Sequence, residues 1–440
     1  MKTFLFCLLI FIPLTFSYGQ EDHSKHNVAQ PIKTSQQQQI KTSHQHQSSR
    51  PFECSDAEYV DPALAMCVPR PGEYIGSLHT MVHGNAFLIG QSSSGKRGKR
   101  SFAAPHMLMI ESGSSLDMNN YVNLELMLTS ELWTLPNTGN PELLQIGEEN
   151  SYRQPYIDAQ HPHTSPIMGL TLSDTIRLPV GNNHAKIFYS PRGSSTAGPI
   201  AFMHRPTGMV NPDAPLGHHL GQDSGHISSN VLGGALQLGA LRIEPSVFHG
   251  LEPHPTETDI ELGRFNSYAL RLTQELSPSI WLMGSAAYIT SPEHDDTGLA
   301  FRVQYSLSAY TFSEFSHHFK LINALIVGMT RNNSETALRS IGEEFIVPLT
   351  QSKIWGRFEL IERRPAELLV VSANSGVAQW LTALTLGYTY DLFQMDSLNF
   401  GLGGSVTHNI LPPEFANAYD GNPWTGKVFV QLSGADSFDF

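Results

Sequence analysis

From about His79 onward, apolar and polar residues alternate along the chain with a period of two. Residues 384–391 show this clearly, with Leu, Leu, Tyr and Tyr at the even positions and Thr, Gly, Thr and Asp at the odd ones. In a β-strand, successive side chains point to opposite faces, so this alternation is typical of strands that separate two environments. About 16 strands are expected (14 is the neighbouring possibility), near residues 78–90, 102–112, 120–133, 167–178, 184–190, 226–237, 241–249, 266–275, 280–290, 298–310, 319–330, 339–347, 352–362, 380–391, 397–409 and 426–433.

The links between these strands differ in length in a regular way. Short links lie at 113–119, 179–183, 238–240, 276–279, 348–351 and 393–396. Long links lie at 134–166, 191–225, 250–265, 363–379 and 410–425. An even number of strands with short turns on one rim and long loops on the other is typical of outer-membrane barrels. The sequence therefore predicts an all-β fold, a transmembrane antiparallel β-barrel over residues 76–433 with long extracellular loops and a short tail at 434–440.

The segments before the barrel predict export. Lys2, the apolar stretch that follows it and the small residues Ser17 and Gly19 are typical of a signal peptide over residues 1–19. Residues 20–50 are rich in Gln, Ser and His and predict a disordered arm. Residues 51–75 contain Cys54 and Cys67, which we expect to form a disulfide in an oxidising compartment. Together with the even strand number, these segments place the chain in the outer membrane of a Gram-negative bacterium, with both termini in the periplasm.

Composition narrows the classes of partner. Charged residues make up 15% of the chain, below the roughly 25% of soluble domains. The formal net charge of −13 argues against a nucleic-acid partner, which needs clustered Lys and Arg. The expected partners are outer-membrane lipid and lipopolysaccharide, and a small polar solute or metal ion. The basic run 96–100 in the first outer loop could meet lipopolysaccharide phosphates, or it could be a solvated turn.

Histidines are concentrated in the middle of the chain, on or beside the second to fourth long loops. Three segments stand out: Asp158-Ala159-Gln160-His161-Pro162-His163, Phe202-Met203-His204-Arg205-Pro206, and residues 217–226, which contain His218, His219, Asp223 and His226. These segments resemble those of an uncharacterised family of Gram-negative outer-membrane barrels with a His-Pro-His-Asp loop, a Phe-Met-His-Arg-Pro segment and a Gly-His-His…Asp-Ser…His segment. The resemblance covers residues 73–432. The resemblance implies the β-barrel fold and the outer-membrane location, and it implies no activity. The chain departs from the family pattern at Thr164, where the family has an acidic residue.

Three interpretations of the histidine-rich loops remain open. In the first, histidines and carboxylates of the long loops bind a transition metal such as Zn or Cu, because neutral imidazole and carboxylate suit these ions. The candidate ligands are His161, His163, His204, His218, His219, His226, His254 and Asp223, with Asp158 and Glu252 as further carboxylates. In the second, the same residues hydrogen-bond the loops into a structural plug.

The third interpretation is catalytic. His226 and Ser228 stand two apart on an expected strand and so face the same way, similar to the His-x-Ser of lipid A deacylase barrels. A nucleophilic serine with a histidine base could hydrolyse lipid or lipopolysaccharide. The preferred function is passage or capture of a small polar solute or metal ion at a histidine-rich loop cluster, with no enzymatic activity. The alternatives are this hydrolase and a structural or surface-interaction barrel.

Overall fold

The structure is a computed structural model that describes residues 54–440, except 151, 153, 164–165, 224, 226, 256–257, 294–297, 317–318 and 334. The predicted signal peptide (1–19), the polar arm (20–50) and His226 lie outside the described residues.

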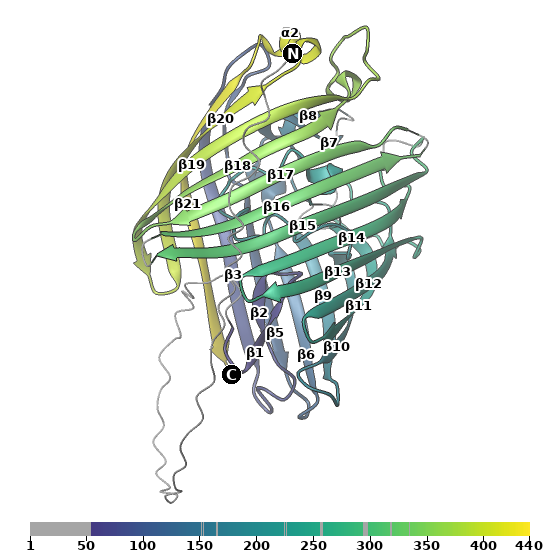
Figure 1. The fold of residues 1–440 in the computed structure, drawn as a ribbon, viewed down its shortest axis with the longest axis vertical. Helices are drawn as coiled ribbons and strands as arrows, with labels where there is room; N and C mark the ends of the chain where they lie inside the picture. The colour runs from purple at the N-terminus through teal and green to yellow at the C-terminus, as the bar shows by residue number, and fades with distance from the viewer. Residues whose placement is uncertain are drawn as a thin grey trace, which may run out of the picture. The chain divides into compact units, whose positions relative to one another are not determined.

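Sixteen strand positions close into one antiparallel barrel, which confirms the predicted fold class (Figure 1). In ring order from the first position the strands are β3 (His79–Ser93), β4 (Arg100–Ala103) with β5 (His106–Ser114), β6 (Asn120–Leu128), β9 (Ile167–Arg177), β10 (His184–Gly193), β11 (Ser228–Leu238), β12 (Leu241–His249), β13 (Ser267–Ser277), β14 (Ile280–Thr290), β15 (Phe301–Ser316), β16 (Phe319–Asn332), β17 (Leu338–Pro348), β18 (Ser352–Arg363), β19 (Gln379–Met395), β20 (Leu398–Ile410) and β21 (Trp424–Asp439). β4 and β5 share one position because both pair with β3. They are interrupted at Pro105, whose nitrogen cannot donate to the ladder.

The outward face of the wall is apolar, as the alternation predicts. On β19 the side chains of Leu384, Leu386 and Tyr388 are all exposed, whereas Ala383 and Thr389 on the other face are buried. Aromatic residues gather on this outer face near both rims. Tyr268, Tyr288 and Phe301 stack at the long-loop rim, and Phe393 stacks on Phe400 near the short-turn rim.

The last strand is longer than predicted, and the expected tail at 434–440 is wrong. β21 continues to Asp439 and pairs with β3 along its whole length, ending at Asp439 opposite His79. Phe440 and Leu78 then exchange two backbone hydrogen bonds. The physical reason is closure: the first strand begins at His79, and an unpaired edge at the end of the barrel would leave its backbone groups unsatisfied.

The long links contain secondary structure of their own that the sequence did not suggest. α1 (Glu131–Thr134) and the hairpin β7 (Asn140–Glu149) with β8 (Pro155–Gln160) lie between β6 and β9. η1 (His218–Leu220) lies before β11, η2 (Pro365–Leu368) after β18, and α2 (Pro413–Tyr419) before β21. In the described part of the chain, no helix is long and apolar enough to cross a bilayer.

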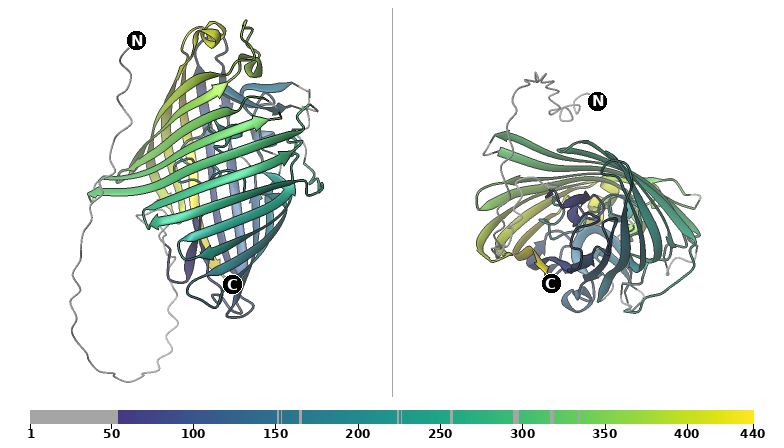
Figure 2. Two further views of the ribbon diagram at one scale, coloured as in Figure 1. Left: turned by 45° about the vertical axis from the view of Figure 1, so that its right-hand side comes forward. Right: turned by 90° about the horizontal axis from the view of Figure 1, so that it is seen from below.

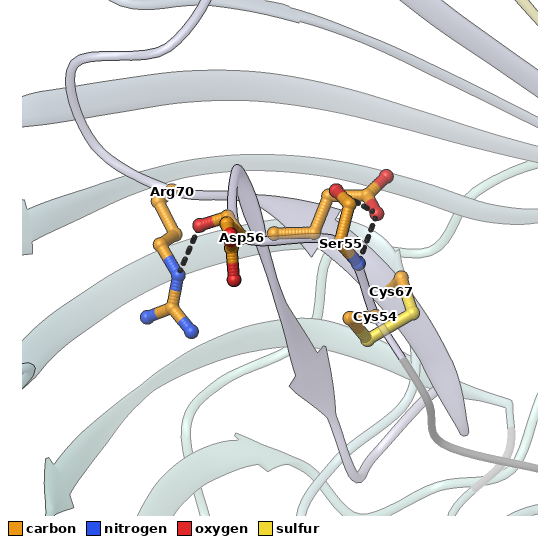
Figure 3. The surroundings of a disulfide bond; sticks show 6 residues. Cys54, Ser55, Asp56, Cys67 and Arg70 are labelled. Carbon is orange, nitrogen blue, oxygen red and sulfur yellow. Dashed lines mark hydrogen bonds between the residues drawn. A yellow bond between two sulfur atoms is a disulfide. The ribbon is translucent and has the colours of Figure 1, made fainter.

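Residues 54–69 form a small hairpin inside the ring, seen in purple in the view along the barrel (Figure 2, right). Its strands are β1 (Glu58–Asp61) and β2 (Met66–Pro69), and the Cys54–Cys67 disulfide, with Cα atoms 5.5 Å apart, joins the residues before β1 to β2 (Figure 3). The structure thus confirms the predicted disulfide. The hairpin tip is held by Asp61, which is paired with Lys186 of β10 at 3.1 Å and with Arg242 of β12 at 3.2 Å.

The inward face of the wall packs against protein. Arg271, Arg357 and Glu359 point inward and are each at least nine-tenths buried. The described residues of the long segments 130–166 and 191–227 fold into the barrel, and Arg357 and Glu359 hydrogen-bond to Ala214 and Leu216 of the second segment. Buried clusters such as that of Leu216, Leu220, Ile361 and Phe415 join these segments to the wall. The 54–69 hairpin and the long link before β11 meet in the lumen, where Leu64 and Ala201 line one cavity.

Candidate functional site

The histidine-rich segments meet inside the long-loop end of the barrel, and Asp223 joins two of them. One carboxylate oxygen of Asp223 accepts a hydrogen bond from the backbone N–H of Phe202 at 2.8 Å. The other accepts from Nδ1 of His218 at 3.1 Å. The Phe-Met-His-Arg-Pro segment and the Gly-His-His segment are therefore parts of one folded unit, although residues 207–216 separate them in the sequence.

Three histidines of this unit lie close enough to share a ligand. One ring nitrogen each of His161, His218 and His219 lies within 4.8 Å of the others. The rings of His218 and His219 have centroids 4.5 Å apart, and His161 lies 6.2 and 6.0 Å from them. Zinc binds imidazole nitrogen at about 2.0–2.1 Å, so small rotations of the three rings would bring them to one ion.

The hydrogen bonds of two rings fix which nitrogen faces inward. Nδ1 of His161 donates to the carbonyl of Pro162 at 3.0 Å, and Nδ1 of His218 donates to Asp223. In a neutral imidazole, the nitrogen that does not donate carries the lone pair, so Nε2 is the ligand atom in both rings. A carboxylate behind a ligating histidine is the usual second shell of a metal site, because it fixes the ring and raises its basicity.

Two glycines let the histidine turn reach the barrel wall. Gly221 has a φ of +85°, and a Cβ on Gly328 of β16 would lie 1.9 Å from the carbonyl oxygen of Leu220. The wall then holds the turn by its carbonyls: Thr330 donates to His219 O at 3.1 Å, and Ser340 donates to Leu220 O at 2.9 Å. Because strands are rigid, these contacts set the position of the histidines.

A buried ion-pair network holds the Phe-Met-His-Arg-Pro segment. The Arg205 guanidinium donates twice to Glu344 of β17, at 3.0 and 2.8 Å, and Thr207 donates to the same carboxylate. Arg357 of β18 lies 3.3 Å from Glu344. Arg205 also donates to the carbonyls of Ile200 and Gln222, so it links both motif segments to the wall. Such two-point Arg–carboxylate pairs are strong and geometrically specific.

The segment before the histidine turn is anchored in a similar way. Glu359 of β18 accepts from the N–H of Leu216 at 2.5 Å, and Arg363 donates to the carbonyl of Leu216 at 2.7 Å. Lys427 of β21 pairs with Asp213. Inward charges on two strands, β18 and β21, thus position this segment, and the sequence pattern alone did not pair them with it.

His163 belongs to a separate ion pair. Its Nδ1 lies 2.5 Å from Glu131 of α1, whose carboxylate also accepts the backbone N–H of His163 at 3.0 Å. Burial would raise the pKa of Glu131, but the charge and hydrogen bonds of His163 outweigh it and hold that pKa below its usual value. This contact fixes α1 against the His-Pro-His loop, so the role it gives His163 is structural.

The other predicted site residues that the structure describes do not belong to the three-histidine group. Within the described chain, the three-histidine group does not include His163, His204, His254 or Asp223. The ring of His204 lies instead against His83 of β3, with centroids 6.3 Å apart. Asp158 accepts from Tyr419 of α2 at 2.6 Å and from Arg97 at 3.0 Å, so it closes the loop cap, and Arg97 of the basic run faces the protein.

The catalytic pair is not brought together in the described residues, because His226 lies outside them. Ser228 is 5% exposed and lines a cavity of about 40 Å³ together with His218, Asp223 and Glu252. A cavity of that volume is about the share of one or two water molecules, and an acyl chain is far larger.

A larger cavity lies beside one of the three histidines. It measures about 480 Å³, and His219, Arg302, Glu335 and Arg364 line it. Most of its lining comes from the long loops and the strand ends beside them. His219 therefore borders a space large enough for a hydrated ion.

Comparisons with known proteins bear on the fold. No family model and no curated protein matches this sequence. Among solved structures, OmpF of Salmonella typhi in complex with daunomycin aligns with 81% of this chain and 97% of its own, at 8% identity and a TM-score of 0.50. An anion-selective porin from Comamonas acidovorans aligns with 82% of this chain and 98% of its own, at 12% identity and a TM-score of 0.47. The chain has the fold of a 16-stranded, porin-like outer-membrane barrel.

Proposed function

We propose that this protein is an outer-membrane barrel that captures a transition-metal ion at His161, His218 and His219, inside the extracellular mouth. The three ring nitrogens within 4.8 Å of one another carry this proposal. Because folded segments fill the lumen, passage of the ion or of a small polar solute requires the plug to move. The metal, Zn or Cu, enters through the cavity beside His219.

The membrane location is supported by the outer surface of the wall. Leucine, valine and aromatic side chains cover the outward face, and stacked aromatic residues lie near both rims. An apolar band between two aromatic girdles is what a barrel presents to lipid. In such barrels the long loops are extracellular and the short turns periplasmic, which places the lipopolysaccharide beside the loops that cover the histidines.

The metal assignment is supported by more than proximity. Asp223 orients His218 from behind, the Pro162 carbonyl orients His161, and the wall fixes the carbonyl of His219. A plug without metal would need only hydrogen bonds between the loops and the wall. It would not need three imidazoles to face one another beside a cavity.

Binding of Zn(II) to the full mature chain in detergent tests this proposal. Isothermal titration should show one tight site in addition to weaker binding by the histidine-rich arm (20–50). His161→Gln and His219→Gln should each remove that site, and Asp223→Asn should weaken it about 10- to 100-fold, the usual effect of losing an outer-shell partner.

His249→Gln is the matched control, because His249 lies near the same rim and its ring nitrogen bonds to the Arg264 carbonyl. It should leave the tight site unchanged. Equal Zn(II) binding by all four variants and the parent chain would contradict the proposal and favour a metal-free plug.

A further inference from the structure

A second group of side chains that are able to bind metal lies in the lumen, and most of its members are methionines. Met107, Met109, Met127, Met168 and Met203 form one buried cluster, in which the other buried members are Ala201 and Ile227. Five of the 13 methionines of the chain are therefore gathered at one place. Lumen packing alone is satisfied elsewhere in this barrel by Leu, Ile, Val and Phe, as in the cluster around Ile361 and Phe415.

The strand register places a histidine in line with two of these methionines. His83 of β3 is directly opposite Met109 of β5, and Met109 is directly opposite Met127 of β6. Directly opposed residues of antiparallel strands have Cβ atoms about 4.5–5.5 Å apart on the same face. An imidazole and two thioethers thus form a row across three neighbouring strands, facing the lumen.

The long link between β10 and β11 adds further residues to this group. Met203 belongs to the cluster, and the next residue, His204, packs its ring against His83 with centroids 6.3 Å apart. His204 is only 7% exposed. Among the described residues, no group hydrogen-bonds to the ring of either histidine, so both rings are available to a ligand. A purely structural methionine cluster would have no use for two unpartnered imidazoles at its edge, whereas a metal site would use both as ligands.

We propose that His83, His204, Met109, Met127 and Met203 form a site for a soft monovalent ion, Cu(I) or its analogue Ag(I). Thioether sulfur selects soft ions, and imidazole also accepts copper. This site shares no side chain with the His161–His218–His219 group and does not depend on it. The two are neighbours through Phe202, whose backbone N–H bonds to Asp223 and whose ring lies between the methionine cluster and the ring of His218.

Titration of the full mature chain with Ag(I), which needs no reductant, tests the assignment. Competition with a soluble chelator should give one tight Ag(I) site. Met109→Leu with Met127→Leu keeps the side-chain volume and removes two sulfurs, so we expect at least a 10-fold loss of Ag(I) affinity. His204→Gln should give a similar loss. With Cu(I), X-ray absorption should show sulfur neighbours that disappear in the double variant.

Met283→Leu is the matched control, because Met283 also faces the lumen, is 1% exposed and lies in a different cluster. It should bind Ag(I) as the parent chain does. His161→Gln and His219→Gln should also keep Ag(I) binding even where they lose Zn(II), which separates this site from the other. An Ag(I) affinity unchanged in the double methionine variant, or no tight site in the parent chain, would overturn the proposal.

Discussion

On strand β17, Glu343 and Glu344 are neighbours in sequence, yet they face different surroundings. Glu343 is exposed on the outer face, where Asn323 donates to it at 3.0 Å. Glu344 is 2% exposed, forms ion pairs with Arg205 and Arg357, and accepts a hydrogen bond from Thr207. A side chain on the outer face has no particular protein partner to match, so many residue types are tolerated there. The inner face meets a folded plug, so each inward charge has a particular partner and replacement is costly.

The largest expected effect is at Glu344. Glu344→Gln leaves the buried Arg205 and Arg357 without their counter-charge, and breaking a buried network in this way costs about 3–5 kcal/mol. The plug should loosen, which urea unfolding in lipid vesicles and new conductance in planar bilayers would show. Glu343→Gln is the control and should change stability by less than about 0.5 kcal/mol. Equal effects of the two variants would remove the distinction between the faces.

A somewhat smaller effect is expected at Asp61, which anchors the disulfide hairpin. Asp61→Asn should cost about 3 kcal/mol, because it leaves Lys186 without its partner, whereas Arg242 keeps Glu244 and Lys186 keeps some contact with water. The hairpin should then leave the lumen more often, so the Cys54–Cys67 disulfide should be reduced faster by a soluble thiol. Asp56→Asn changes an exposed carboxylate of the same hairpin and should leave the rate unchanged.

The pH dependence of the hairpin follows from the same residue. Burial opposes ionisation of Asp61, but the charges of Arg242 and Lys186 outweigh it and lower its pKa. A depressed carboxyl pKa stabilises the folded state above the unfolded value of about 3.9, and this stabilisation is lost as the pH falls through the folded value. The disulfide should stay protected at pH 5 in the parent chain, and protection should weaken only well below pH 4. Loss of protection near pH 6 would contradict this.

The smallest effect is expected where the histidine turn touches the wall. Gly328→Ala places a methyl group 1.9 Å from the Leu220 carbonyl, so the turn must shift, at about 1–3 kcal/mol for overpacking. The Zn(II) affinity should fall as well, because Leu220 directly follows His218 and His219 and a shift of the turn would move both histidines. Gly426→Ala, where nothing lies within 4 Å, should affect neither stability nor Zn(II) binding. An unchanged Zn(II) affinity in Gly328→Ala would show that the wall does not position the site.

The sequence by itself determined the wall. Period-two alternation and loop lengths predicted a 16-stranded barrel, with apolar residues such as Leu386 outward, because a strand puts successive side chains on opposite faces and lipid accepts any apolar one. The export signal, which implies an oxidising compartment, predicted the disulfide between Cys54 and Cys67. The motif segments marked His161, His218 and His219 as candidates, along with histidines that lie elsewhere.

Only the tertiary structure decided what fills the barrel. Arg205 and Glu344 are distant in sequence, and so are His83 and His204, and no local pattern couples them. Methionines at 107, 109 and 127 carried a weak signal, since all stand at inward positions of their strands, but a sequence read for alternation treats them as ordinary apolar residues. The strand at 434–439 was missed because its sequence lacks the regular apolar–polar alternation, and its partner is the first strand of the ring. Partners set by closure and by inserted loops depend on three-dimensional contact, which periodicity does not encode.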